Sequence, residues 1–295
     1  MSKRDVTLFA KGLEFPEGPA FDRKGNLFIV DVHTADISKI STNGKVEKFV
    51  NTGGHPNGAR FHANGDLYVA EREKGIIAVS PGGAIRIVVD NYQGKKFNGP
   101  NDLMFDSDGN LYFTDPHGSS PANPIGCIYR LSTKGEITQI ASGLPYPNGL
   151  VVCPLPPGMP SPTGSLMSSE GRDLFVAITH KNRIIRFTID ERGIPVRSTI
   201  FSQLSGGWAG PDGMAMDVAG NLYVAHYSAG DVLMLNSKGE LIERVPVGGS
   251  RPTNVAFGGP DRKTLFVTET ETGCIYKFST DHPGLPLYGD VNVGK

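Results

Sequence analysis

The stretch Phe15-Pro16-Glu17-Gly18-Pro19 contains a phrase that recurs along the chain with one informative position changed. Each copy begins with proline, has a polar residue second, and is followed by an apolar run, a turn and another apolar run. The later copies are Pro56-Asn57-Gly58, Pro100-Asn101-Asp102, Pro147-Asn148-Gly149, Pro211-Asp212-Gly213 and Pro252-Thr253-Asn254. Successive prolines are separated by 40, 44, 47, 64 and 41 residues, which indicates six repeats.

Repeats of this length, each containing several short strands, are typical of the blades of a β-propeller. In the second repeat we expect four strands, at residues 58–61, 66–71, 75–79 and 84–89, separated by turn residues. The 38 glycines and 22 prolines disfavour helices throughout the chain. We therefore predict an all-β, six-bladed propeller of four-stranded antiparallel blades, which forms a single domain over residues 1–295.

The two ends of the chain indicate how the ring closes. The last repeat ends after its third strand, near Phe278, whereas an apolar run at 6–9 precedes the first repeat and matches the outer strand expected at 46–50. We predict that this N-terminal strand completes the last blade, which would remove an exposed sheet edge. The alternative is an open solenoid, in which the last blade lacks one strand.

Two connections differ from the rest in length. The fourth repeat contains a proline-rich insertion at 153–172, which we expect to be a surface excursion between the first and second strands of its blade. In an up-and-down blade this connection lies on the face opposite the repeated phrases. The loop at 116–126 returns to the same face as Glu17, and it is the best candidate for a lid or a specificity wall.

Composition excludes several classes of partner. The 29 Lys and Arg residues balance 30 Asp and Glu, so no basic surface is expected to hold nucleic acid. No apolar run approaches the length of a membrane span or a signal peptide, and we expect a cytoplasmic protein that acts on a small molecule. The three cysteines, Cys127, Cys153 and Cys274, cannot all pair and are predicted to be buried thiols.

The second residue of each phrase should face the central channel of a closed ring. These residues are Glu17, Asn57, Asn101, Asn148, Asp212 and Thr253 or Asn254. Two carboxylates and three carboxamides offer oxygen ligands only, which points to a hard divalent cation. Calcium is favoured, with magnesium, manganese or zinc as alternatives. Four protein ligands would leave coordination positions for water and substrate, as in a catalytic site.

The phrases Pro-Glu-Gly-Pro, Pro-Asn-Asp, Pro-Asn-Gly and Pro-Asp-Gly, in this order and on this period, resemble the SMP-30/gluconolactonase/LRE-like family. That family includes lactonases and a related phosphotriesterase that are six-bladed propellers. The resemblance implies a channel-bound divalent cation held by Glu17, Asn101, Asn148 and Asp212, with Asp212 also acting as base or nucleophile. Some sugar-lactonase members carry an arginine shortly before the third phrase. Here that stretch, at 95–99, reads Lys-Lys-Phe-Asn-Gly, which weakens the expectation of an aldonolactone substrate.

Other residues of the expected metal face are candidates for contact with substrate. We predict substrate binding for Asn57, His117, His226 and Trp208. The alternatives are turn capping for Asn57, structural hydrogen bonds for the histidines and core packing for Trp208. A further set of carboxylates, which end second strands, is expected to bind loop amides: Asp31, Glu71 and Asp115.

These patterns predict a metal-dependent hydrolase that opens a lactone, with Asp212 as the catalytic residue. The chain has no Gly-x-Ser-x-Gly elbow before a helix and no His/Cys set with zinc spacing, which disfavours serine and zinc hydrolysis. Organophosphate hydrolysis at the same site and a non-catalytic ligand-binding propeller are the alternatives. If Asp212 is a ligand only, the base is sought among Asp102, His117 and His226.

Overall fold

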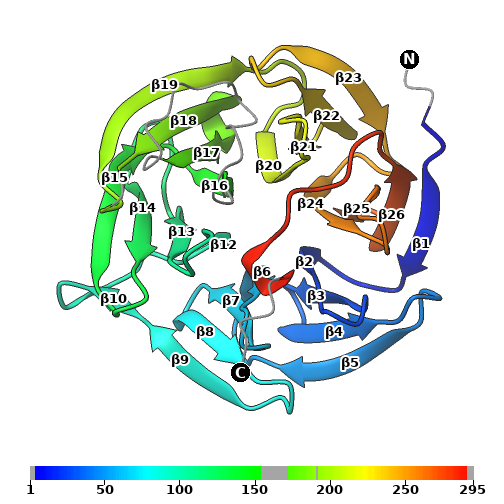
Figure 1. Cartoon of the computed structure of the whole chain (residues 1–295), viewed down its shortest axis with the longest axis horizontal. Helices are drawn as coiled ribbons and strands as arrows, with labels where there is room; N and C mark the ends of the chain where they lie inside the picture. Colours follow the sequence, from blue (N-terminus) through cyan, green and yellow to red (C-terminus); the bar gives the residue numbers. More distant parts are fainter. Residues whose placement is uncertain (1–3, 154–171, 191, 291–295) are drawn as a thin grey trace.

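The computed structural model describes residues 4–153, 172–190 and 192–290, and these residues form a six-bladed β-propeller. Six four-stranded antiparallel sheets stand radially around a central axis, as Figure 1 shows looking down that axis. In five of the six blades the strands follow one another in sequence order from the axis outwards, and the sixth blade takes its outer strand from the N-terminus. The predicted fold is confirmed.

Each blade has an inner strand that begins within three residues of the repeated proline. Blades one and two comprise β2 (Pro16–Phe21), β3 (Leu27–Asp31), β4 (Asp36–Ile40), β5 (Val46–Asn51), β6 (Pro56–Phe61), β7 (Leu67–Glu71), β8 (Gly75–Val79) and β9 (Ile85–Val89). Blades three and four comprise β12 (Leu103–Phe105), β13 (Leu111–Asp115), β14 (Gly126–Leu131), β15 (Ile137–Leu144), β16 (Pro147–Val152), β17 (Arg172–Ile178), β18 (Arg183–Ile189) and β19 (Pro195–Gln203). Blades five and six comprise β20 (Gly210–Met216), β21 (Leu222–Tyr227), β22 (Asp231–Leu235), β23 (Leu241–Pro246), β24 (Pro252–Gly258), β25 (Thr264–Glu269), β26 (Cys274–Ser279) and β1 (Thr7–Lys11).

The N-terminal strand closes the ring, as predicted from the phase of the repeats. β1 pairs antiparallel with β26 and forms the outer strand of the last blade, where Figure 1 shows it beside β26. Arg4 adds contacts that tie this end to the same region, because its guanidinium lies 2.8 Å from both Glu243 Oε2 and Asp281 Oδ2. The open solenoid is therefore excluded.

The described residues also contain elements that the sequence did not predict. A two-stranded hairpin, β10 (Asn91–Tyr92) with β11 (Lys95–Lys96), lies between blades two and three. The only helical turns in this part of the chain are η1 (Thr179–Lys181) and η2 (Tyr288–Asp290). None of its helices has the length and apolar character needed to cross a membrane. The insertion separates β16 from β17 as expected, but residues 154–171 lie outside the described residues.

The apolar core lies between neighbouring blades. Residues that alternate along the strands of blades one and two, such as Val30, Ile37, Val69 and Ile77, are fully buried against one another. A larger cluster joins blades three, four and five. The three cysteines are buried free thiols, which confirms the prediction made for them.

The repeated Pro-x-Gly phrase has a structural reason at the axis. In most inner strands the register shifts within the phrase, as between Pro147 and Leu150, so a bulge aims the second side chain away from the regular pleat. The third residue sits where adjacent inner strands almost touch. A β-carbon at Gly149 would lie 2.6 Å from Gly213 Cα, and one at Gly58 would lie 2.6 Å from Asp102 Cα. Glycine is therefore required there for packing.

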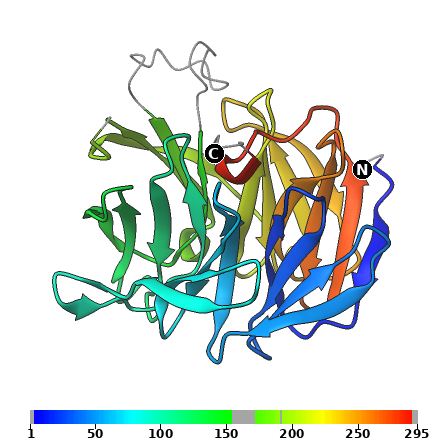
Figure 2. The same cartoon turned by 60° about the horizontal axis from the view of Figure 1, so that its bottom comes forward.

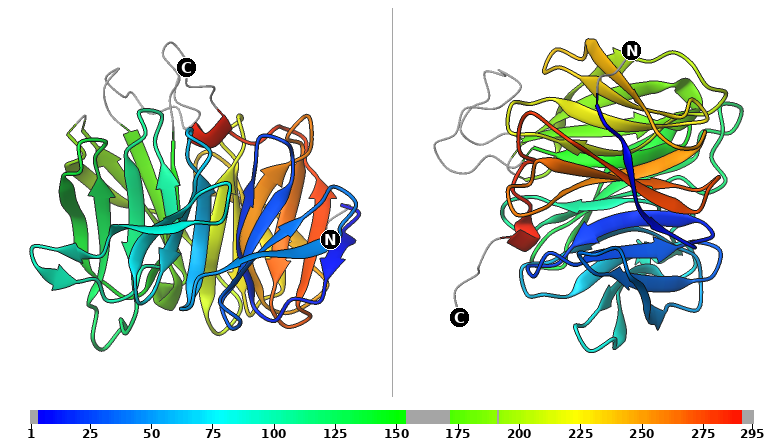
Figure 3. Two further views of the ribbon diagram at one scale, coloured as in Figure 1. Left: turned by 90° about the horizontal axis from the view of Figure 1, so that it is seen from below. Right: turned by 90° about the vertical axis from the view of Figure 1, so that its right-hand side faces the viewer.

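The C-terminal segment leaves blade six and crosses one face of the ring towards the axis. Figures 2 and 3 show η2, in red, on this face. The turns between first and second strands, such as 22–26 in blade one, lie on the same face, because Arg23 Nε donates a hydrogen bond of 3.0 Å to Gly289 O. The starts of the inner strands, and with them the second residues of the phrases, belong to the opposite half of the ring.

Deleting residues 1–10 should destabilise the whole domain, because β26 would lose its outer partner and the ring its closure. We expect a loss of about 3 kcal/mol, which corresponds to roughly 6 °C or more in the unfolding midpoint of a domain of this size. Thermal unfolding followed by circular dichroism measures it. Leu8→Ser, at a side chain that is 52% exposed, should leave the midpoint unchanged. An unchanged midpoint in the truncation would contradict closure by β1.

Candidate functional site

The structure brings the predicted ring of polar side chains together at the axis. Glu17, Asn101, Asn148 and Asp212 are all more than nine-tenths buried, although they come from four different blades. Glu17 and Asp212 lie close enough for each charge to disfavour the other, since the Glu17 carboxylate raises the pKa of Asp212. Thr253, in blade six, is buried as well.

Glu17 is held by two donors on one of its oxygens. Its Oε2 accepts hydrogen bonds from the backbone N–H of Gly18 at 2.9 Å and from Asn254 Nδ2 at 3.1 Å. Asn254 in turn has its Oδ1 bonded to the backbone N–H of Val255. The side chain of Glu17 is thus oriented by blades one and six together.

A chain of hydrogen bonds fixes Asn148 and links blades three, four and five. Asn148 Nδ2 donates to Thr179 Oγ1 at 3.2 Å, and that hydroxyl donates to Pro211 O at 2.7 Å. On the other side, Thr114 Oγ1 donates to Asn148 O at 2.8 Å. Both threonines follow the apolar runs of second strands, so the rigid sheets position the ring from behind.

A second polar layer lies next to the ring. The sequence pointed to Asp102 as a candidate base and to Asn254 as a ring residue, but not to Arg60 or to the layer that the three residues form. Four of the six phrases have glycine third, whereas blades three and six have Asp102 and Asn254. These two side chains occupy the space that Gly58 and Gly213 of the neighbouring blades leave free. Two residues further along β6 lies Arg60, at a position where the other inner strands have alanine, methionine or valine. Asp102, Asn254 and Arg60 each differ from the residue most common at their position of the repeat, and this difference was a signal in the sequence that could have pointed to the layer.

Burial raises the pKa of the three acids of the site, and repulsion between charges adds to this for Glu17 and Asp212. Burial raises the pKa of Glu17 to about 7, and the Asp102 charge adds to this, while the hydrogen bond from Gly18 opposes it. The pKa of Asp212 is raised well above its usual value by burial, then by Glu17 and Asp102. Burial also raises the pKa of Asp102, against the field of Arg60. A cation at the centre would relieve all three effects.

The donor set fits a hard divalent cation. Asn101 Oδ1, Asp102 Oδ2 and Asn57 Oδ1 are buried and have no hydrogen-bond partner, which is unusual for polar atoms in a folded protein. Carboxylate and carboxamide oxygens are the ligands that calcium or magnesium accepts, whereas zinc prefers nitrogen and sulfur. Within the described residues no group of three or more His, Cys, Asp or Glu side chains has the geometry of a metal site.

Side chains from loops of several blades surround the ring on the face where the inner strands begin. We call this region, which contains Arg72, His117 and Tyr146, the mouth. Tyr146 precedes the fourth phrase in a left-handed backbone conformation (φ 66°), which is uncommon for a bulky residue and is enriched at functional sites. Burial and the Asp212 charge raise the pKa of Tyr146, and Arg72 acts in the opposite direction. Tyr146 also contacts the ring of His180, with centroids 4.7 Å apart. The sequence did not single out Tyr146 or Arg72.

The stretch before the third phrase leaves room for neighbouring side chains. A β-carbon at Gly99 would lie 2.7 Å from His117 Cβ and 2.8 Å from Arg72 Cγ. His117 is exposed on the loop that begins at Pro116, at the face predicted for it. Arg72 makes no ion pair or side-chain hydrogen bond with any described residue. Its guanidinium remains available to a ligand at the mouth.

Of two other residues predicted to contact substrate, Trp208 is exposed and His226 is buried. Trp208 is 79% exposed and meets the ring of Tyr227, which excludes the alternative that it packs in the core. His226 is fully buried within β21, and its Nε2 lies 2.8 Å from Asn182 Oδ1. Burial lowers its pKa to about 4. His226 lies within β21 and not on a loop of the expected metal face, so its position does not favour contact with substrate.

The carboxylates that end second strands bind loop amides, as predicted. Asp31 accepts hydrogen bonds from the backbone of Glu14 and Phe15, and Asp115 from that of Asn98 and Gly99. Glu71 accepts from His55, Glu73 and Lys74, and Glu269 plays the same part in blade six. In blade five the repeated proline, Pro211, pairs with His226, so the histidine occupies the place that a carboxylate has in these other blades. These residues fix the loops around the mouth.

Comparison with known proteins agrees with this geometry. The family model described as SMP-30/gluconolactonase/LRE-like region matches residues 15–271. The chain belongs to this family. It is 28% identical to the gluconolactonase of Zymomonas mobilis, over 89% of this chain and 78% of that protein. It is 31% identical to the lactonase drp35 of Staphylococcus aureus (strain MW2), over 81% of this chain and 71% of that protein.

A solved structure has the same fold as this chain. The gluconolactonase of Xanthomonas campestris superposes with a TM-score of 0.78 at 24% identity, over 94% of this chain and 90% of that one. The resemblance inferred from the repeated phrases is therefore confirmed.

The raised pKa of Glu17 predicts how the stability of the metal-free protein depends on pH. Folding favours the protonated acid, so this contribution is complete below pH 4.5 and is lost as the pH rises through about 7. In the presence of a chelator, the unfolding midpoint should fall more between pH 5 and pH 7.5 for the wild type than for Glu17→Gln. Thermal unfolding of both proteins in matched buffers measures this. Identical pH profiles would show that Glu17 ionises normally in the folded chain.

Proposed function

We propose that this protein is a metal-dependent lactonase, which opens a cyclic ester at a divalent cation on the propeller axis. One observation carries the proposal: Glu17, Asn148 and Asp212, from three blades, are buried within interaction range of one another, and Asn101 Oδ1 is buried without a partner. Relatives named gluconolactonase and lactonase support hydrolysis of a lactone. Calcium is the cation that the all-oxygen set favours.

Glu17, Asn101, Asn148 and Asp212 would hold the cation. When bound, it supplies Lewis-acid polarisation of the carbonyl oxygen of the ester. Glu17 contributes negative charge and is kept in place by Gly18 and Asn254. Asn148 is kept in place by Thr179, so its amide cannot turn freely away from the centre.

Asp212 would act on the attacking water. In the metal-free protein, burial and then the charges of Glu17 and Asp102 raise the pKa of its carboxyl group, and a bound cation would offset this rise and keep the group ionised. It can therefore accept the proton of a water molecule as that water attacks the ester carbon. The ring then opens as the proton held by Asp212 passes to the leaving alkoxide oxygen, which gives a hydroxyl group and a carboxylic acid that releases its proton to water.

The mouth would select and retain the substrate. Arg72 offers an unpaired guanidinium beside Gly99 and His117, where it can bind hydroxyl groups of the lactone or the carboxylate that ring opening creates. Tyr146 lies within the electrostatic reach of both Arg72 and Asp212 and can serve as a wall between mouth and centre. This arrangement suits a small polar lactone.

Removing the cation should abolish hydrolysis without unfolding the protein, because the blades are held by apolar packing between sheets. Purified protein treated with a chelator should lose activity on a panel of γ- and δ-lactones, followed with a pH indicator. Added calcium should restore it. Circular dichroism before and after treatment checks that the fold persists.

Two outcomes of this experiment would contradict the proposal. Full activity in protein shown by elemental analysis to be free of metal would rule out the role of the cation. The same panel should include a phosphotriester. If the protein hydrolyses the phosphotriester and none of the lactones, the phosphotriesterase alternative is favoured.

The two carboxylates of the ring should respond differently to substitution. Glu17→Gln keeps an oxygen ligand, so it should weaken calcium binding and recover most of its turnover at high calcium. Asp212→Asn also removes the base, and saturating calcium should leave turnover about 10² to 10⁴-fold below the wild type. Turnover measured across a calcium titration separates the two. Recovery of Asp212→Asn at high calcium would assign Asp212 to metal binding alone.

A further inference from the structure

A cavity lies at the mouth of the propeller opposite the proposed lactonase site. Its volume is about 810 Å³, within the size range of sites for small organic molecules. The fifth residues of the six inner-strand phrases all line it: Ala20, Arg60, Met104, Val151, Ala215 and Ala256. These positions are three residues beyond the ring of Glu17 and Asp212, or about 10 Å along an extended strand.

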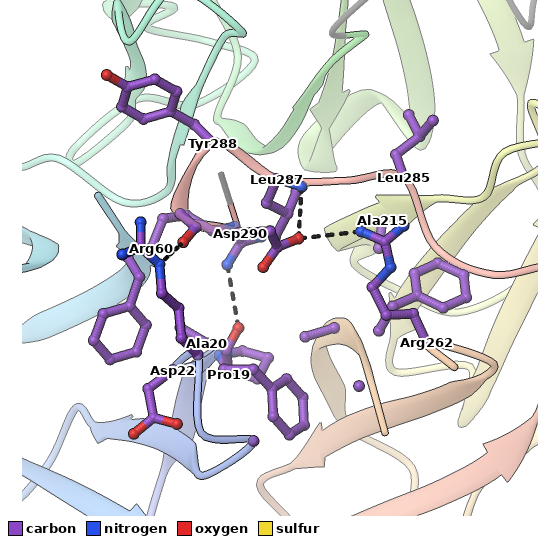
Figure 4. Close-up of a pocket in the computed structure, with 18 of the residues that line it drawn as sticks. Pro19, Ala20, Asp22, Arg60, Ala215, Arg262, Leu285, Leu287, Tyr288 and Asp290 are labelled. Carbon is purple, nitrogen blue, oxygen red and sulfur yellow. Dashed lines mark hydrogen bonds and ion pairs between the residues drawn. The ribbon is translucent and has the colours of Figure 1, made fainter. Parts of the chain in front are cut away.

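The C-terminal segment forms part of the wall of this cavity. Leu285 N–H donates a hydrogen bond of 2.9 Å to Met216 O, and Leu287 and Tyr288 continue across the mouth (Figure 4). Asp290 accepts from Leu287 N–H and pairs with Arg262 at 3.2 Å, as the dashed lines in Figure 4 show. These contacts hold the segment at the rim, while the inner wall stays largely apolar.

Arg60 is the exception in that wall. Its side chain belongs to a residue that is only 5% exposed, yet it has no ion pair with any carboxylate of the described residues. One terminal nitrogen donates to Ala59 O at 2.8 Å and to Pro19 O at 3.3 Å, the latter drawn in Figure 4. Nε is buried and has no partner. A buried guanidinium with unused donors is costly unless an anion completes it.

The acids near the axis offset only part of the charge of the Arg60 guanidinium. Arg60 lowers the pKa of Asp102 and of Glu17, so its charge is felt at the polar centre. Neither carboxylate lies within 4 Å of its guanidinium, however, and Asp102 Oδ2 has no partner of its own. The cavity side of Arg60 therefore remains open to a second anion.

We propose that this cavity binds a small amphiphilic carboxylic acid, with the carboxylate on Arg60 and the hydrocarbon body against the apolar wall. Aromatic and aliphatic side chains are available for the body at the ends of the inner strands: Phe21, Phe61, Phe105, Val152, Met216 and Phe257. A planar guanidinium matches a carboxylate in geometry and charge. The cavity is lined by none of Glu17, Asn101, Asn148 or Asp212, so a ligand there would not occupy the proposed metal site.

The test is a titration of the full chain with 4-phenylbutyrate and with the neutral 4-phenylbutanol, by isothermal titration calorimetry. The acid should bind at least tenfold more tightly than the alcohol. Arg60→Met should remove this preference, because it removes the positive charge that binds the carboxylate. Methionine is chosen because blade three has it at the equivalent position, Met104. Arg72→Met removes a cation at the opposite mouth and should leave the affinity for the acid unchanged.

A second variant keeps the test valid if Arg60→Met fails to fold. Ala215→Phe places a ring in the cavity and leaves Arg60 intact, so it should weaken binding of the acid at least tenfold. Circular dichroism checks that each variant is folded. The proposal is overturned if the wild type does not bind the acid, if folded Arg60→Met binds it as tightly as the wild type, or if Ala215→Phe has no effect. Loss of binding in Arg72→Met would instead place the acid at the lactonase mouth.

Discussion

Six inner strands meet so closely at the propeller axis that a glycine is required where neighbouring strands touch. This close approach determines the form of the repeated phrase. Proline begins the inner strand, the bulge aims the second side chain out of the regular pleat, and the third residue cannot have a β-carbon unless the neighbour gives way. Where the third residue is Asp102 or Asn254 instead, the adjacent blade provides the space through Gly58 or Gly213.

The same closeness explains the electrostatics of the site. Glu17, Asp102 and Asp212 are held in a region without enough positive charge, so burial raises the pKa of each, and repulsion between charges adds to this for Glu17 and Asp212. The sheets behind them are rigid and apolar, and hydrogen bonds through Thr114, Thr179 and Asn254 keep the side chains from turning away. In our account a divalent cation offsets this repulsion. Burying the acids lowers the stability of the metal-free fold, and the acids are present because metal binding and catalysis require them.

Much of the fold could be predicted from the sequence because each blade repeats the same local code. Apolar runs of strand length, glycine-containing turns and the phase of the two termini predicted the blades and their closure by β1. The hairpin of β10 and β11 was missed, since two-residue strands leave no periodic pattern. The ring residues were found because they vary at one fixed position of the repeat.

The remaining features depend on three-dimensional neighbours. His226 was expected at the mouth, but β21 extends to Tyr227 and buries the histidine where other blades have a carboxylate. Arg60 and Tyr146 have no motif of their own. Their significance appears only when the cavity at one mouth and the field of Asp212 at the other are known. A cavity lined by six blades and the C-terminal segment cannot be read from any single repeat.

The most direct measurement is an anomalous difference map from crystals grown with calcium. Our account predicts one peak on the propeller axis, with oxygen atoms of Glu17, Asn101, Asn148 and Asp212 at about 2.3 to 2.6 Å. The hydrogen bond between Asn254 and Glu17 should persist in that structure. A map without a peak at the centre of the ring, or a cation bounded by other side chains, would contradict the central claim that these four residues form one metal site.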